Sequence, residues 1–99
     1  MRITSSAVSL NVADEQASAA FLRDHFGFVE EMGADGFVSL SRPDAGFNVI
    51  FLRTGLSTFK PASMAGHAAD GLLLVFVVDD VDAEAERLAQ AGLAFTTPI

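Results

Sequence analysis

The alternation of apolar and polar positions near the N-terminus predicts a β-strand that leads into an amphipathic helix. Over residues 7–12 one face is apolar and the other is smaller or polar: Val8, Leu10 and Val12 against Ala7, Ser9 and Asn11. This period of two is that of a strand. Asp14 then stands where a helix N-cap is expected, and Gly27 where a left-handed residue would end the helix. Between them an apolar stripe follows helical spacing: Ala17, Ala20, Phe21, Leu22 and Phe26.

Three short strands are predicted after this helix, over residues 28–32, 37–41 and 47–53. The segments between them, 33–36 (GADG) and 42–46 (RPDAG), are rich in the Gly, Pro and Asp residues that form turns. The first half of the chain is therefore expected to form a βαβββ unit.

The same order of signals returns in the second half of the chain. An apolar run over 72–78 predicts a strand. Asp80 is placed to cap a helix, 66 positions after Asp14, and Gly92 is placed to end it. A further strand over 93–97 can follow. A supersecondary unit repeated in this way predicts two modules of one kind.

The repeat divides the chain into module one (1–54), a linker (55–71) and module two (72–99), which stops two strands short of module one. The linker is rich in small residues, Gly and Pro and has no periodicity. The chain is then a fragment, or has a C-terminal tail beyond this sequence, or takes the missing strands from another chain. Unpaired strand edges and exposed apolar surface usually demand a partner, so a homodimer is expected.

Composition narrows the choice of partners. The chain has 13 acidic and 6 basic residues and a formal charge of −7, whereas a nucleic-acid partner is bound through clustered Lys and Arg. No apolar run approaches the roughly 18 residues of a membrane span, so a cytoplasmic protein with no membrane partner is expected. The sequence contains no cysteine, which excludes disulfides and thiolate chemistry.

The spacing of apolar, acidic and glycine positions across nearly the whole chain is similar to that of one family. The residues that carry the similarity are Val8, Leu10, Val12, Asp14, Phe21, Gly27 and Phe28, then Phe76, Val78, Asp79, Asp80, Val81 and Asp82. Their order resembles the vicinal oxygen chelate superfamily of glyoxalase, bleomycin-resistance and extradiol-dioxygenase proteins. The resemblance implies an α+β fold, with 1–99 as a single domain. Two βαβββ modules would form a cup from curved mixed sheets, with the helices outside.

The resemblance also indicates whether a metal is bound. Metal-dependent members carry a His or Gln just before the Val of the first strand, which is Ala7 here, and a matching ligand that falls at Leu73. A Glu on the final strand completes such sites, and the sequence given ends before that strand. Because a metal ligand must offer a lone pair on N, O or S, no metal and no other cofactor are expected, and no catalytic residue is assigned.

The side chains of the cup follow from the same resemblance. Segment 48–52 (NVIFL) resembles the family's N-L-I-E-L strand, which puts Phe51 at the Glu position, facing inward. The ligand-binding residues predicted in this way are Ser9, Asn11, Phe47, Phe51, Arg53, His67 and Leu73. Such an apolar, aromatic surface suits a flat or hydrophobic ligand. Structural roles stay open as well: a core for the two phenylalanines, a surface charge for Arg53 and a solvated loop position for His67.

These observations favour a metal-independent protein that binds a small molecule, an antibiotic or a hydrophobic metabolite, and acts by sequestration as bleomycin-resistance proteins do. One alternative is a metal-dependent glyoxalase-type lyase, isomerase or dioxygenase that uses His67 or a Glu beyond this sequence. Another is a structural or regulatory domain whose cup is only a core.

Overall fold

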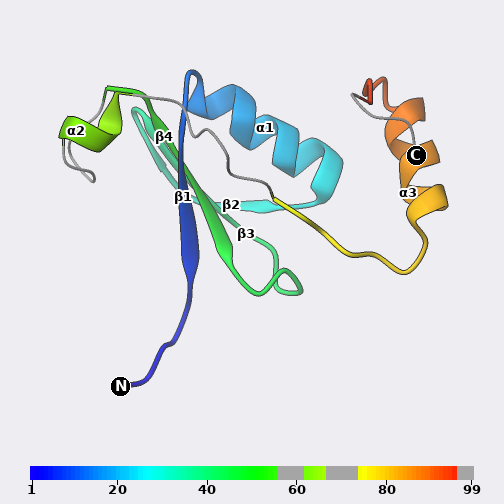
Figure 1. Ribbon diagram of the computed structural model, residues 1–99, viewed down its shortest axis with the longest axis horizontal. Coiled ribbons are helices and arrows are strands. Elements are labelled where there is room, and N and C mark those ends of the chain that lie inside the picture. The colour runs from blue at the N-terminus through cyan, green and yellow to red at the C-terminus, as the bar shows by residue number, and fades with distance from the viewer. Residues whose placement is uncertain (56–61, 67–73, 96–99) are drawn as a thin grey trace.

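The computed structural model of the chain describes residues 1–55, 62–66 and 74–95, and its centre is a four-stranded sheet (Figure 1). The strands are β1 (Ala7–Val12), β2 (Val29–Ala34), β3 (Phe37–Ser41) and β4 (Asn48–Arg53). Their order across the sheet is β1-β4-β3-β2. The pair β1 and β4 is parallel and the other neighbours are antiparallel, so the sheet is mixed. The α+β class and the βαβββ order predicted for the first half are confirmed.

The strand boundaries agree closely with the sequence pattern except at β2. β1 and β3 have the predicted bounds, and β4 begins one residue later than predicted. β2 begins at Val29 and continues to Ala34, where it pairs with Phe37, so the turn before β3 shrinks to Asp35 and Gly36. Gly36 takes a φ of 79°, a conformation that glycine adopts without steric cost.

Helix α1 (Glu15–Phe26) lies between the two cap residues that the sequence indicated, Asp14 and Gly27. The Asp14 carboxylate accepts hydrogen bonds from the backbone amides of Gln16 and Ala17, both at 3.1 Å. Gly27 takes a φ of 69° and closes the C-terminal turn.

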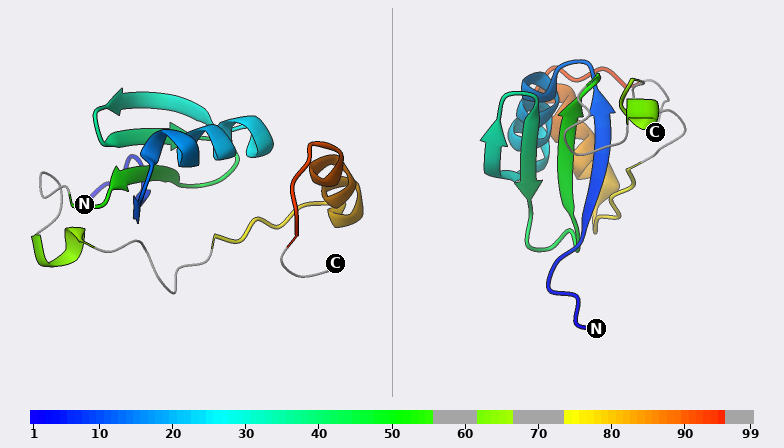
Figure 2. Two further views of the ribbon diagram at one scale, coloured as in Figure 1. Left: turned by 90° about the horizontal axis from the view of Figure 1, so that it is seen from above. Right: turned by 90° about the vertical axis from the view of Figure 1, so that its left-hand side faces the viewer.

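The core lies between α1 and one face of the sheet. Val38, Leu40 and Val49 have no exposed surface. They pack with Ala19 and Leu22 of α1 in one cluster of buried side chains, whose other members are Leu10, Phe28 and Phe51. The helix therefore covers one face of the sheet, and no other helix of comparable length in the described residues covers the opposite face (Figure 2).

Two further helices lie in the second half of the chain. α2 (Ala62–Ala65) falls within the predicted linker, where four residues are too few to show a helical period. α3 (Val81–Gln90) has the predicted N-cap, because the Asp80 carboxylate accepts from the Ala83 amide at 3.0 Å. No helix in the described part of the chain is long and apolar enough to cross a membrane. The cytoplasmic location stays a prediction.

The strands predicted over 72–78 and 93–97 are wrong where the structure describes these segments. Residues 74–78 are extended but belong to no strand, and 93–95 are not in a strand either. A strand exists only through its ladder with a neighbour, and no described strand runs beside 74–78. We call residues 74–95 the arm, because they run out past the C-terminal end of α1 (yellow to red in Figure 1).

Candidate functional site

The register of the sheet separates its strand positions into two faces. Directly paired residues share a face, and successive residues alternate between faces. Leu10 pairs with Phe51 and Leu40 with Val49, and all four belong to the core under α1. Ser9 and Ser39 both pair with Ile50, so these three side chains lie on the opposite side.

We call that opposite side the open face. From β1, β4 and β3 it receives nine side chains: Ala7, Ser9, Asn11, Asn48, Ile50, Leu52, Phe37, Ser39 and Ser41. Phe37 and Ile50 are half-buried, and Ser9 is exposed. Asn11 and Leu52 are buried, at 7% and 3% exposure. The open face is thus apolar at its centre with hydroxyl and carboxamide groups around it. In the right-hand view of Figure 2 the four strands stand in front of α1.

Two of the predicted site residues, Ser9 and Asn11, lie on the open face as expected, whereas Phe51 does not. Phe51 is 6% exposed and packs in the core on the α1 side, opposite to the predicted orientation. Segment 49–52 is apolar at every position, so the sequence pattern alone could not decide which side chains face the helix. Ile50 and Leu52, and not Phe51, are the apolar residues that β4 presents on the open face.

Arg53 was expected to share the cup and instead closes an ion network at the end of the sheet near the start of α1. Its guanidinium donates to both carboxylate oxygens of Asp35, at 3.2 and 3.1 Å. Its Nη1 lies 3.8 Å from Oε1 of Glu15, a carboxylate that is 4% exposed and accepts from the Gly36 amide at 3.1 Å. The hydrogen bond from Arg53, and then its charge, lower the pKa of Asp35.

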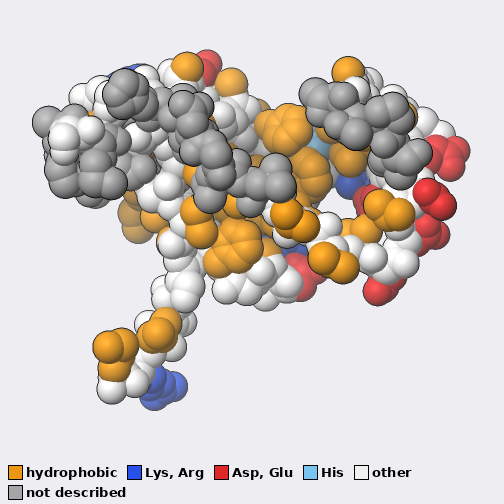
Figure 3. All heavy atoms as spheres, viewed as in Figure 1, with side chains coloured by type: hydrophobic (Ala, Val, Ile, Leu, Met, Phe, Trp, Pro, Cys, Tyr) orange, Lys and Arg blue, Asp and Glu red, His pale blue; other side chains and the backbone are white. Residues whose placement is uncertain are grey.

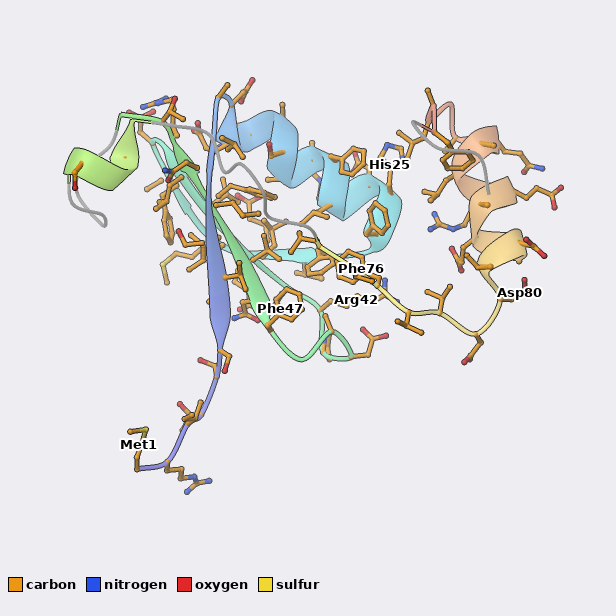
Figure 4. All side chains as sticks on the ribbon, in the orientation of Figure 1. Met1, His25, Arg42, Phe47, Phe76 and Asp80 are labelled. Atoms are coloured by element: carbon orange, nitrogen blue, oxygen red, sulfur yellow. The ribbon has the colours of Figure 1, made fainter. Side chains whose placement is uncertain are left out.

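Phe47 lies in a separate hollow, which we call the aromatic cleft. The cleft has a volume of about 730 Å³ and lies between the C-terminal turn of α1, the loop before β4, and the arm. Five phenylalanines of the described residues line it: Phe26, Phe28, Phe47, Phe76 and Phe95. The ring centroid of Phe76 is 5.6 Å from that of Phe26 and 5.8 Å from that of Phe28. Figure 4 labels Phe47, Phe76, Arg42 and His25, which lie around this region.

The charged groups of the cleft are paired with one another. Arg42 Nε lies 2.6 Å from Asp44 and Arg87 Nε lies 2.8 Å from Glu84. The hydrogen bond between Arg42 and Asp44 raises the pKa of the guanidinium and lowers the pKa of the carboxyl.

Both of these arginines also hold the C-terminal end of α1. Arg42 Nη1 donates to the backbone carbonyl of Phe26, and Arg87 Nη2 donates to that of His25 at 2.9 Å. The carbonyls at a helix C-terminus lack partners within the helix and carry its partial negative charge. Arg87 thereby attaches the arm to α1.

The remaining expectations concern His67, Leu73 and metal binding. His67 and Leu73 lie outside the described residues. Ala7 begins β1 and presents only a methyl group to the open face. Among residues 1–55, 62–66 and 74–95, no group of three or more His, Cys, Asp or Glu side chains could hold a metal ion.

Comparisons with known proteins add to this geometry. The profile of the Glyoxalase/Bleomycin resistance protein/Dioxygenase superfamily matches residues 4–99. A search of curated proteins gives no match. A glyoxalase/bleomycin resistance protein/dioxygenase from Nocardioides, a solved structure, is 23% identical with a TM-score of 0.74, over 99% of this chain and 68% of that one.

Two other solved structures represent different activities. TnmS3, an antibiotic binding protein from Streptomyces sp. CB03234, is 27% identical with a TM-score of 0.60, over 95% of this chain and 75% of that one. Lactoylglutathione lyase from Agrobacterium tumefaciens is 22% identical with a TM-score of 0.71, over 93% and 72%. The chain therefore spans between 68% and 75% of the lengths of these three proteins.

Proposed function

Because the chain belongs to the glyoxalase/bleomycin resistance protein/dioxygenase superfamily, we propose that its open face binds a small hydrophobic molecule and holds it unchanged. The family resemblance deduced from the sequence is thus confirmed. Its members include both binding proteins and enzymes, as TnmS3 and the lyase illustrate. The choice between these classes has to come from the side chains of this chain, because one fold hosts many functions.

The observation that carries the proposal is the chemistry of the open face. None of the nine side chains directed there by β1, β4 and β3 is a carboxylate or an imidazole. Catalytic zinc and related metals are held mainly by imidazole, thiolate and carboxylate groups. The half-buried Phe37 and Ile50 instead offer apolar surface, and covering such surface yields about 25 cal/mol per Å². Ser9 and Ser39 provide hydroxyls that can orient a ligand.

The ligand we propose is an antibiotic or a hydrophobic metabolite with a flat portion that covers Phe37 and Ile50. TnmS3 is an antibiotic binding protein, and its similarity to this chain supports this class of ligand. Retention without reaction, which is sequestration, fits a surface whose centre holds hydrocarbon, hydroxyl and carboxamide groups. A carboxylate lies at its β2 edge, where Glu31 accepts a hydrogen bond from the Ser41 hydroxyl.

We also propose a homodimer in which a second copy packs over the open face and closes the ligand space. Val29 pairs with Ser41 and Met32 with Ser39, which places both apolar side chains on the same side of the sheet. They are 59% and 63% exposed, and exposed apolar clusters commonly mark interfaces. In this arrangement residues 1–99 form a single domain, of which module two is the second part. Sedimentation equilibrium over a wide concentration range should show dimer, and a monomer at every concentration would contradict the arrangement.

The experiment uses calorimetric titration against a panel of antibiotics and hydrophobic metabolites. For a compound that binds, Ile50→Asn should weaken affinity by at least tenfold, because an amide replaces the apolar centre of the open face. Ile3→Asn is the matched control, since Ile3 lies in the N-terminal segment outside the sheet and is 72% exposed. It should leave the affinity unchanged.

Two further measurements separate binding from catalysis. Mass spectrometry of the ligand after prolonged incubation should recover it unaltered, with or without added Ni²⁺, Zn²⁺, Fe²⁺ or Mn²⁺. Metal-dependent turnover, or stoichiometric metal in the purified protein, would favour the lyase, isomerase or dioxygenase class instead. Equal affinities of Ile50→Asn and the unaltered protein for the ligand would show that the ligand does not bind at the open face.

A further inference from the structure

We propose that the aromatic cleft is a second binding site, distinct from the open face, for a planar and uncharged aromatic molecule. Its position is the first argument. Phe28 belongs to the core cluster on the α1 side of the sheet, and Phe47 and Phe76 pack against that cluster. The open face lies on the other side of the sheet. A ligand in the cleft therefore touches a different surface from one on the open face.

The size and shape of the cleft fit a small molecule. Its volume of about 730 Å³ lies within the range of roughly 300–1,000 Å³ that ligand pockets occupy. The phenylalanine rings come from α1, from the segment after it, from the loop before β4, and from both ends of the arm.

The apolar surface of the cleft wall is only partly covered by the protein itself. Phe95 is 45% exposed and Val78 is 46% exposed, and both line the cleft. Figure 3 shows hydrophobic side chains gathered between the sheet and the arm. A flat aromatic molecule can stack on the exposed ring of Phe95 and remove this surface from water, with the offset or edge-to-face geometry that aromatic pairs prefer.

The charges select an uncharged ligand. Each arginine of the wall already has a carboxylate partner: Arg23 with Asp24, Arg42 with Asp44, and Arg87 with Glu84. A second nitrogen of each of Arg42 and Arg87 donates to a backbone carbonyl of α1. A carboxylate or ammonium group on the ligand would have to displace one of these partners, at the cost of its own desolvation. A neutral ring system leaves the pairs intact and can also lie against the guanidinium planes.

The test uses N-phenyl-1-naphthylamine, an uncharged aromatic probe that fluoresces in apolar surroundings. The protein has neither Trp nor Tyr, so its own emission does not interfere. The probe should bind, and Phe95→Ser should raise its dissociation constant about fivefold to tenfold, the loss expected for one aromatic contact. Ile3→Ser is the control, because Ile3 is 72% exposed and lies in the N-terminal segment, away from the cleft wall. It should change the constant by less than about twofold.

Two comparisons distinguish this proposal from the proposed function. Ile50→Asn should leave probe binding intact, and Phe95→Ser should leave binding of the open-face ligand intact, so either site can fail without the other. The anionic relative of the probe, 1-anilinonaphthalene-8-sulfonate, should bind at least tenfold more weakly. Loss of probe binding in Ile50→Asn but not in Phe95→Ser, or equal affinity for the anionic dye, would overturn the proposal. Circular dichroism on each variant confirms that a lost signal is not lost folding.

Discussion

The two aspartate-capped helices of this protein are held in different ways. α1 buries Glu15, Ala19 and Leu22 against the sheet. α3 has a comparable N-cap but buries no residue, and among the described residues it is linked to α1 by the hydrogen bond from Arg87 to the His25 carbonyl. Most helical stability in proteins comes from packing of an apolar face, not from the helix itself. The sheet region (7–53) is therefore expected to unfold as one unit, and the arm to open on its own at lower free energy.

The difference has consequences for ligands. A surface carried by the sheet region, such as the open face, is fixed by the core beneath it. The aromatic cleft has one wall on the sheet region and one on the arm, so its width depends on how firmly the arm is attached. A ligand in the cleft would stabilise the closed position of the arm by mass action.

The largest expected contrast is between two Leu→Ala substitutions. Leu40 has no exposed surface, and Leu40→Ala should lower the free energy of unfolding by about 2–5 kcal/mol through lost burial and a residual cavity. Leu88 is half-buried in α3, and Leu88→Ala should lower the free energy of unfolding by no more than about 1 kcal/mol. Urea titration followed by far-ultraviolet circular dichroism measures both. Equal costs would mean that the arm is an integral part of the cooperative unit.

The two caps provide a second contrast. Asp14→Ala removes the acceptor for the amides of Gln16 and Ala17 and should lower the free energy of global unfolding by about 1 kcal/mol. Asp80→Ala removes the acceptor for the Ala83 amide. It should reduce helical signal while the urea midpoint of the sheet region stays unchanged. A midpoint shift of similar size in both variants would show that α3 and the sheet region unfold together.

The features that could be predicted from the sequence are those encoded by neighbouring residues. The alternation over 7–12 and the caps Asp14, Gly27 and Asp80 act within a few residues of themselves. The apolar run over 72–78 was an equally strong local signal and predicted a strand wrongly for its described residues, because a ladder also needs a neighbour that no local pattern specifies.

The candidate sites also show that local sequence patterns do not specify contacts between distant segments. Ser9 and Asn11 were placed on the correct face because one side of β1 is clearly apolar. The orientation predicted for Phe51 was wrong, because β4 is apolar on both sides. The aromatic cleft was not foreseen at all, since it joins side chains from segments as far apart as Phe26 and Phe95. Among its lining residues, only Phe47 had been predicted to bind a ligand.

A third, smaller effect tests the attachment of the arm directly. Arg87→Gln shortens the side chain, so that the hydrogen bond to the His25 carbonyl and the ion pair with Glu84 are both lost. The loss of a partly exposed charged hydrogen bond, about 0.5–1 kcal/mol, should speed amide hydrogen exchange in α3 about two- to fivefold. Arg23→Gln is the control, because Arg23 is also ion-paired, with Asp24, but donates to no helix carbonyl in the part of the chain that the structure describes. Unchanged exchange in Arg87→Gln would leave Phe76 as the main attachment.

The smallest expected effect is an acid dependence that belongs to the sheet region alone. Arg53 lowers the pKa of Asp35 below the ordinary value of 3.8 by hydrogen bonding and charge. A carboxyl group whose pKa is lower when folded than when unfolded contributes stability above the unfolded value, and that contribution disappears as the pH falls through the folded pKa. The urea midpoint of the unaltered protein should therefore decline as the pH falls below about 4. In Asp35→Asn this part of the decline should be missing. Exchange of the arm amides should respond equally in both proteins, because the side-chain bonds of Asp35 and Arg53 within the described part of the chain join them to each other and to Glu15. An acid response of the arm that vanished in Asp35→Asn would show that the two regions are coupled after all.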